Sequence, residues 1–470
     1  MQVIYRAVVS NVSASRKTFD TAARRGTLRR MQGERPVRRG LTRRDVLIGG
    51  GALGAAAVLG VAATGSPFRG GRETVTFWHL FGGGDGERLT EILADIDAEH
   101  ADSDVRELIL PWGNPYYTKL ALAAVGGSPP DVAVVHATRL PSFAPAGLLE
   151  ELTPELLARH GLEGDRFLEQ PWRSGQSSGR QYAIPLDTHP FVLYYNTDLV
   201  KEAGLLDGEG KLKPLDGEDA LLDACEAIKD KTGKTGLVFE TRGVTPWRVF
   251  LTLYTQLGGP PIIEEGGARI GMDDDAAIRA LEWMTKPAER GVGGPDVDYQ
   301  GSVAFFSNQS AAFALNGEWE VTTYQAMKLP FGMRTVPTVF DRPATQADSH
   351  TFVIPRDPGR SPARLDAALA FISRLVNKGL DWAKGGHVPA YRAIFDSEEY
   401  RKLSPQSDYA SAVDDLVFDP LAWYSGSGSN LEANAGTAFS PVVTGSQRPE
   451  QGLRTFRDYL DQMSKTPKPV

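Results

Sequence analysis

The chain has almost no cysteine. Its 470 residues contain one, Cys225, so no disulfide can form within the chain and folding cannot depend on oxidative pairing. Cys225 stands in the segment LLDACEAIKD, at a predicted helix-face position. We therefore interpret it as a buried core thiol rather than a reactive group.

The body of the chain lacks an excess of positive charge. Residues 1–72 carry 14 Lys and Arg against 3 Asp and Glu, whereas the remaining residues carry 37 against 56. A protein that binds nucleic acid needs basic groups to neutralise the phosphates. The acidic body therefore argues against a nucleic-acid partner, and the basic N-terminal extension requires a separate explanation.

The chain also lacks a strongly hydrophobic run. The best candidate, Val46–Ala63, is rich in Gly and Ala and follows Arg43 and Arg44. This pattern resembles a twin-arginine-type export signal, which predicts an extracytoplasmic protein and cleavage near residues 63–65. At 18 residues the run is also just long enough for a single retained membrane anchor, so that alternative stays open. Translation from Met31 would produce a leader of ordinary length.

The glycine-rich turn at residues 82–86 lacks the spacing of a dinucleotide-binding fingerprint. That fingerprint needs a third glycine three residues after Gly84, where this chain has Glu87. A phosphate cradle is therefore not predicted. The turn, which includes Asp85, can still bring its backbone close to a ligand, and Trp78 and His79 precede it at the end of a predicted strand.

The segment GQSSG, residues 175–179, fits the pattern of a hydrolase nucleophile elbow with Ser177 as the nucleophile. An elbow has to follow a buried strand and open a helix. Here the segment is a polar turn that precedes the strand-like RQYAIPL. We therefore expect no serine hydrolase, and no enzyme.

Alternating strand and helix patterns follow the leader. VTFWHL, VRELIL and DVAVVHA have the composition of strands, and DVAVVHA is almost entirely apolar, as in a strand buried on both faces. Between them come a helical pattern at Leu89, Ile92, Leu93 and Ile96 and a second helix in NPYYTKLALAAVGG. This order predicts an open, mostly parallel sheet with helices on both sides. Further helices are predicted around residues 217–230 and 275–290.

Histidines gather near the predicted strand ends. Five of the seven do so: His79, His136, His189, His350 and His387. None shows the short spacing of metal motifs, such as two histidines separated by one or three residues. Neutral imidazoles that hydrogen-bond to hydroxyl groups fit this pattern better, so no metal and no cofactor is predicted. A zinc-binding cluster and a purely structural role for each histidine are the alternatives.

Several stretches together carry a family resemblance. They are VTFWH, GGSPPDVAVVHATRLPSFAPAGLLEEL, YAIPLDTHPFVLYYNTDLV, FALNGEWEV, DSHTFVIP and GGHVPAYRAIF. In their order and spacing they resemble the extracellular solute-binding proteins of carbohydrate ATP-binding-cassette importers, the maltose-binding type. The resemblance covers roughly residues 73–465.

The resemblance implies an α/β fold of two lobes, the periplasmic-binding-protein-like fold of type II. Each lobe would be a mostly parallel sheet flanked by helices, and a hinge of two or three crossings would join the lobes. The N-terminal lobe would take residues 73–186 and 336–385, and the C-terminal lobe residues 187–335 and 386–470. Residues 1–72 would be the basic extension and signal. Ligands of open α/β sheets bind beyond the carboxyl ends of the strands.

The resemblance also implies a set of ligand-binding residues. Trp319, which follows Asn-Gly in FALNGEWEV, matches the tryptophan that stacks on a sugar ring. Polar side chains around it would bind the sugar hydroxyls. The expected site residues are Trp319, Glu318, Asp187, His189, Trp78, His79, Asp85, His136, Thr138 and Arg139, with His350, His387, Trp247 and Trp423 as weaker candidates.

The function that follows is capture without catalysis. The protein would be a monomer that closes on a mono- or oligosaccharide and delivers it to the permease subunits of an importer. Other small solutes fit the same fold: glycerol phosphate, a polyamine or a metal ion. Glycerol phosphate would need basic groups at the site, and Arg139 is the only evident one.

Overall fold

The computed structural model describes residues 74–100 and 104–468. The predicted extension and export signal, residues 1–72, lie outside the described residues, so the signal stays a prediction. None of the helices in the described ranges is both long and apolar enough to cross a membrane.

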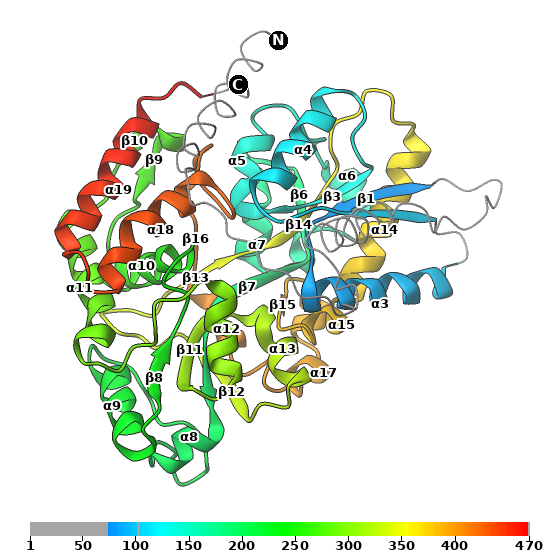
Figure 1. Ribbon diagram of the computed structural model, residues 1–470. Coiled ribbons are helices and arrows are strands. Elements are labelled where there is room, and N and C mark those ends of the chain that lie inside the picture. The colour runs from blue at the N-terminus through cyan, green and yellow to red at the C-terminus, as the bar shows by residue number, and fades with distance from the viewer. Residues whose placement is uncertain (1–73, 101–103, 469–470) are drawn as a thin grey trace, which may run out of the picture. The chain divides into compact units, whose positions relative to one another are not determined.

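The first sheet has five strands in the order β2-β1-β3-β14-β6 (Figure 1). They are β1 (Val75–His79), β2 (Val105–Ile109), β3 (Val132–His136), β14 (His350–Val353) and β6 (Ala183–Pro185). Strands β1, β2 and β3 are parallel, because α3 (Gly83–Glu99) and α4 (Asn114–Val125) each return the chain to the same end of the sheet. β3 is buried along its whole length, as its apolar sequence predicts.

The second sheet is centred on the long strand β7 (Asp187–Asn196), in the order β16-β13-β7-β11-β8, with β12 and β15 also paired to β7. The other strands are β8 (Thr235–Val238), β11 (Ala311–Gly317), β12 (Phe331–Thr335), β13 (Thr345–Asp348), β15 (Val388–Pro389) and β16 (Leu416–Phe418). Every partner of β7 runs antiparallel to it. The α/β fold is confirmed, but the sheets are mixed rather than mostly parallel.

The chain crosses between the two sheets twice with almost no loop. Leu186 alone separates β6 from β7, and Ser349 alone separates β13 from β14. The first crossing leads the chain into the second sheet and the other leads it back, so β13 runs antiparallel to β7, with Asp348 opposite His189. This return path accounts for the directions of β13 and β14, which run antiparallel to β7 and β3. β13 pairs in the second sheet although it belongs to the predicted range 336–385, and the lobe boundaries stay a prediction.

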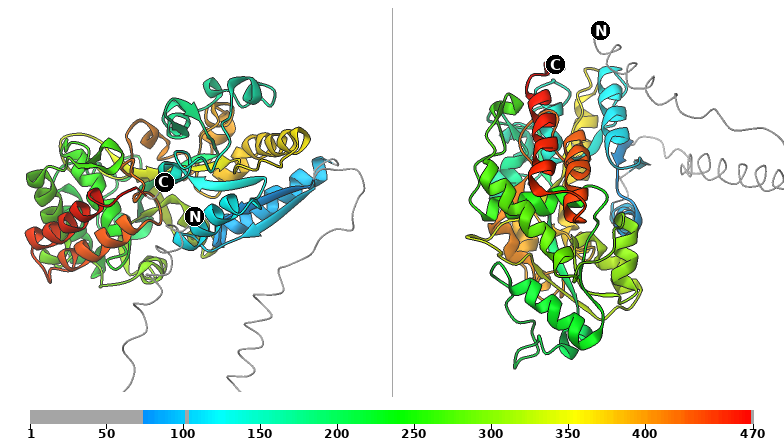
Figure 2. Two further views of the ribbon diagram at one scale, coloured as in Figure 1. Left: turned by 90° about the horizontal axis from the view of Figure 1, so that it is seen from above. Right: turned by 60° about the vertical axis from the view of Figure 1, so that its left-hand side comes forward.

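The first sheet packs in one hydrophobic core, here called the first core, and the second sheet packs in two, of which the larger is called the second core. In the first core, α3 contributes Leu89, Ile92 and Ile96, the spacing that predicted this helix. The second core contains the predicted helices α9 (Ala220–Thr232) and α11 (Asp274–Glu289), and Cys225 is buried in it, as expected. Helices α18 (Asn430–Val443) and α19 (Pro449–Ser464) pack together and against α11 (Figure 2).

Ser177 does not lie on an elbow. It ends the two-residue strand β4 (Gln176–Ser177), which pairs with β5 (Arg180–Gln181) in a small hairpin. A hairpin turn is not the strand-to-helix turn that exposes a nucleophile. The local structure therefore agrees with the expectation that Ser177 is not a hydrolase nucleophile.

Candidate functional site

A cavity of about 1030 Å³ is lined by residues from both sheets. The first sheet contributes residues 80–85, which follow β1, residues 109–112, which begin at the last residue of β2, and His136 at the end of β3. The second sheet contributes residues after β8 and β11, including Glu240, Arg248, Trp319 and Glu320. The carboxyl ends of parallel strands are where ligands of α/β sheets bind, so this cavity is the candidate site.

Trp319 lies in the wall of this cavity. Strand β11 ends at Gly317, and a single helical turn, η4 (Glu318–Glu320), then places the half-buried indole over the backbone. A Cβ atom on Gly317 would lie 2.1 Å from the ring, so only glycine permits this position. The indole nitrogen donates a hydrogen bond to the Tyr299 hydroxyl at 2.6 Å, and the Arg248 guanidinium carbon lies 5.3 Å from the ring centroid.

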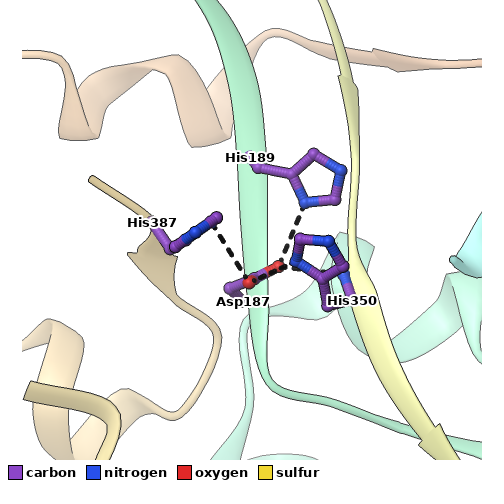
Figure 3. A group of neighbouring side chains, drawn as sticks. All are labelled: Asp187, His189, His350 and His387. Carbon is purple, nitrogen blue, oxygen red and sulfur yellow. Dashed lines mark hydrogen bonds and ion pairs between the residues drawn. The ribbon is translucent and has the colours of Figure 1, made fainter. Parts of the chain in front are cut away.

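Four of the predicted residues meet at the crossings between the sheets. We call Asp187, His189, His350 and His387 the Asp187 cluster (Figure 3). Their candidate ligand atoms all lie within 4.8 Å of one another, and all four residues are buried. Asp187 and His189 begin β7 and point to the same face because they alternate along the strand. His350 begins β14, and His387 precedes β15.

The carboxylate of Asp187 is the centre of this cluster. His350 Nδ1 lies 2.8 Å from Oδ2, His189 Nδ1 lies 3.2 Å from Oδ1, and His387 Nδ1 lies 3.4 Å from Oδ2. The indole nitrogen of Trp382 also donates to Oδ2 at 2.7 Å. Burial alone would raise the pKa of Asp187, but the charges of His350 and His387 and the hydrogen bonds outweigh burial and hold this pKa well below its ordinary value.

His387 lies among three carboxylates. Its Nε2 is 3.0 Å from Asp85 Oδ1, and its Nδ1 is 2.9 Å from Glu318 Oε1 and close to Asp187. Burial would lower the pKa of His387, but the negative charges of Asp85 and Asp187 outweigh burial and keep the pKa well above its ordinary value. Burial raises the pKa of Glu318 to about 7, with His387 opposing.

Two of the histidines that line the cavity, His136 and His189, are held in the neutral form by their surroundings. Burial, together with the neighbouring His350, lowers the pKa of His189 to about 3. The same causes lower the pKa of His136 well below its ordinary value. The ring of His136 is oriented by the Tyr117 hydroxyl, 2.6 Å from Nδ1. Neutral imidazoles can both donate and accept hydrogen bonds, which suits contact with ligand hydroxyls.

Several predicted residues support the wall without lining it. The Thr138 hydroxyl donates to Asp348, and the Arg139 guanidinium stacks over the Tyr117 ring at 4.5 Å. Asp348 itself lines the cavity, and burial raises its pKa to about 7 although Thr138 opposes. Glu318 and His387 are likewise fully buried behind the lining residues. Asp85, His136, His189, His350 and Trp319 are the predicted residues that line the cavity directly.

Other predicted residues lie away from the cavity. His79 is buried between Phe77 and Phe81, with ring centroids 5.1 and 5.6 Å away, and Trp78 on the opposite face of β1 lies under Lys119. Trp247 is buried in the second core, and Trp423 packs against that core. None of these four is among the residues that line the cavity, and their contact with a ligand stays a prediction. Strand alternation and core packing explain their placement, since β1 remains inside the sheet through His79.

Sequence reasoning missed other lining residues. Among them are Trp112, Glu240, Arg248, Tyr299, Glu320, Asp348 and Glu432. Trp112 follows β2 and could have been found by the strand-end rule that selected His136. Arg248, Tyr299 and Glu432 belong to helices α10 (Thr245–Gln256), α12 (Tyr299–Ser307) and α18, where no local pattern distinguishes them.

The fold and this cavity define a two-sheet solute-binding protein, and comparison with known sequences agrees. The sequence profile of the bacterial extracellular solute-binding proteins matches residues 84–379, well over half of the chain. The chain therefore belongs to that family.

Named relatives are binding proteins. The chain is 24% identical over 371 residues to the arabinooligosaccharide-binding protein of Bacillus subtilis, covering 75% of this chain and 81% of that protein. It is 25% identical over 268 residues to a maltooligosaccharide ABC transporter solute-binding lipoprotein of Streptococcus pneumoniae, covering 55% of this chain and 58% of that one. The second match thus spans less than two thirds of the relative's length.

Solved structures share the fold. The GacH receptor of Streptomyces glaucescens, determined unliganded and with acarbose, aligns with a TM-score of 0.71 at 22% identity, covering 84% of this chain and all of the receptor. The cyclic alpha-maltosyl-1,6-maltose binding protein of Arthrobacter globiformis aligns with a TM-score of 0.68 at 21% identity, with the same shares covered. At these identities the likeness establishes the fold alone.

Proposed function

We propose that this chain captures a carbohydrate in the cavity between its two sheets. The observation that carries the proposal is the Trp319 ring in the cavity wall, held by Gly317 and Tyr299 beside buried polar groups. Sugars present C–H groups on the faces of the ring and hydroxyls around its edge. A flat indole covers the faces, and fixed carboxylates and neutral imidazoles bind the hydroxyls.

The size and polarity of the cavity favour an oligosaccharide. At about 1030 Å³ it lies at the upper end of the usual range for small-molecule sites. Asp85, Glu240, Glu320, Asp348 and Glu432 supply carboxyl groups around the cavity, and Arg248 is the one Lys or Arg among its lining residues. Carboxylates accept hydrogen bonds from hydroxyls in a defined direction, which provides specificity.

The names of the relatives support a carbohydrate ligand and its delivery to an importer. Relatives are named for arabinooligosaccharide and maltooligosaccharide binding, and one is named as part of an ABC transporter. By this proposal the protein is exported, acts as a monomer, closes on its ligand by movement about the crossings and delivers it to importer permease subunits. No bond in the ligand is broken, and no cofactor takes part.

An anionic solute is disfavoured. Glycerol phosphate needs basic groups, but Arg139 stacks behind the wall and Arg248 faces an excess of carboxyl groups. A polyamine is the second candidate, because the same carboxyl groups would pair with its ammonium groups.

A thermal-shift screen against carbohydrates tests the proposal. A ligand at 100 times its Kd should stabilise the protein by about 2.7 kcal/mol, which is a readily measured increase in Tm. Oligosaccharides should shift the Tm, whereas spermidine and glycerol phosphate should not. A shift with spermidine and none with any sugar would replace the carbohydrate by the polyamine.

A further inference from the structure

We propose that the Asp187 cluster is a structural binding site for a divalent transition metal of the zinc class. The cluster supplies three imidazoles and one carboxylate, a donor set that suits Zn²⁺. The proposal concerns a second ligand, separate from the carbohydrate, and does not depend on which solute the cavity holds.

The distances within the cluster approach those of a four-ligand site. Ligand atoms about 2.0–2.1 Å from one zinc ion at tetrahedral angles lie about 3.3 Å from each other. The Asp187 oxygens lie 2.8, 3.2 and 3.4 Å from the Nδ1 atoms of His350, His189 and His387. These three distances are close to tetrahedral edges but involve both Asp187 oxygens, and the candidate ligand atoms as a set lie within 4.8 Å of one another, so the side chains must rotate for all four to reach one ion.

The groups around the cluster are those that orient metal ligands. Asp85 Oδ1 lies 3.0 Å from Nε2 of His387, so Nδ1 is the nitrogen that faces Glu318, at 2.9 Å, and Asp187, at 3.4 Å. Trp382 donates to Asp187 Oδ2, and the backbone nitrogen of His350 donates to Oδ1 at 2.9 Å. A carboxylate behind a ligating histidine and hydrogen bonds to a ligating carboxylate are the usual supports of a metal centre.

Buried acidic groups point to a cation at the same place. Nδ1 of His387 pairs with Glu318 Oε1 at 2.9 Å, whereas Glu318 Oε2 is buried without a hydrogen-bond partner among the described residues. Asp85, Asp187 and Glu318 surround this one imidazole with three acidic groups. A divalent ion bound by the cluster would balance this concentration of buried negative charge.

The origin of the ligands indicates what the ion would do. Asp187 and His189 stand on the crossing from the first sheet to the second, and His350 stands on the crossing back. His387 precedes β15, which pairs with β7. One ion would therefore join both crossings and the segment beside them. His189 and His350 also line the cavity, which provides a path for entry.

Metal titration of the full chain, freed of any affinity tag and treated with chelator, tests the site. With Zn²⁺ alone we expect one equivalent bound and an increase in Tm that chelator reverses. With Co²⁺ alone we expect the intense visible absorption of tetrahedral coordination. Carbohydrate is absent from both measurements, so failure of the metal site and failure of sugar binding are distinguishable.

Variants assign the ligands. His350→Gln and His387→Gln should abolish stoichiometric binding, and Asp85→Asn should weaken Zn²⁺ affinity about 10- to 100-fold, as expected for a group that orients a ligand. His160→Gln is the matched control, because His160 pairs with Asp366 outside the cluster. If the first two variants do not fold, the Co²⁺ spectrum of the unaltered protein and the Asp85→Asn titration still decide.

Two results would overturn the proposal. One is the absence of stoichiometric Zn²⁺ binding, together with a weak, octahedral Co²⁺ spectrum. The other is zinc affinity that the cluster variants and Asp85→Asn share with His160→Gln, which would locate the ion elsewhere.

Discussion

Trp319 and Tyr299 form one unit in the wall of the cavity: the indole nitrogen donates to the phenol oxygen at 2.6 Å, and the phenol in turn donates to Glu320. The two residues come from different elements, the turn after β11 and the start of α12. The phenol therefore fixes the plane of the ring that we propose to stack on a sugar.

Removing the Tyr299 hydroxyl should allow the Trp319 ring to move. For Tyr299→Phe we expect ligand affinity to fall about 3- to 10-fold, because one hydrogen bond contributes roughly 0.5–1.5 kcal/mol. Isothermal titration calorimetry with the sugar from the screen measures it. Tyr182→Phe is the control, since Tyr182 packs against the first core. Equal affinity in the two variants would mean that the phenol does not orient the ring for binding.

Substitutions of two tryptophans should distinguish a ligand-binding role from a role in the core. Trp319→Ala should abolish the ligand-induced shift in Tm and leave the Tm without ligand nearly unchanged. Trp247 is fully buried and its indole nitrogen donates to Asp419 Oδ1 at 3.1 Å. Trp247→Ala should therefore reduce the free energy of unfolding by about 3–5 kcal/mol. Thermal and denaturant unfolding of both variants measure these effects. If Trp319→Ala lowered the free energy of unfolding as much as Trp247→Ala does, Trp319 would belong to the core.

Glycine at position 317 should be essential for the position of the ring. In Gly317→Ala the new Cβ would lie 2.1 Å from Cη2 of Trp319, so the indole must move. We expect a loss of stability of about 1–3 kcal/mol and a clear loss of ligand affinity, measured by denaturant unfolding and calorimetry. Gly208→Ala, where nothing lies within 4 Å of the added Cβ, should change neither. Tight ligand binding by Gly317→Ala would show that the observed ring position is not required.

Buried carboxyl groups beside Arg248 should make stability depend on pH. Burial, and then repulsion by Asp419, raises the pKa of Glu432 above its ordinary 4.5, while Arg248 opposes. Between about pH 4.5 and the folded-state pKa of about 8, the folded protein binds more protons than the unfolded chain. The contribution of Glu432 to the free energy of unfolding therefore falls as the pH rises through this range.

Glu432→Gln tests this dependence. Glutamine carries no charge at any pH, so Tm should decline less between about pH 5 and pH 8 in the variant than in the unaltered protein. Differential scanning calorimetry across that range measures both slopes. A variant whose Tm declines as steeply as that of the unaltered protein would show that Glu432 is not the group that titrates.

Much of the candidate site follows from local sequence pattern. The strands and helices of the first sheet could be predicted because β3 is apolar throughout and α3 repeats its apolar residues at helical spacing. The glycine-rich turn located Asp85, and the family resemblance indicated His189, which lies near the start of β7. The end of a strand located His136, since the carboxyl ends of parallel strands share one edge of a sheet. Trp78 and His79 were predicted by the same rule and lie away from the cavity, because β1 stays packed through its last residue.

Other features depend on distant contacts. The helices, the strands and the α/β class could be predicted from the chain, because they depend on periodicity and on neighbouring residues, whereas the two lobes and the role of Trp319 were predicted from the family resemblance. The convergence of His189, His350 and His387 on Asp187, and the contacts of Arg248 and Tyr299 with Trp319, became evident in the folded chain. Those contacts join segments far apart in sequence, and their spacing along the chain carries no trace of the crossings that bring them together.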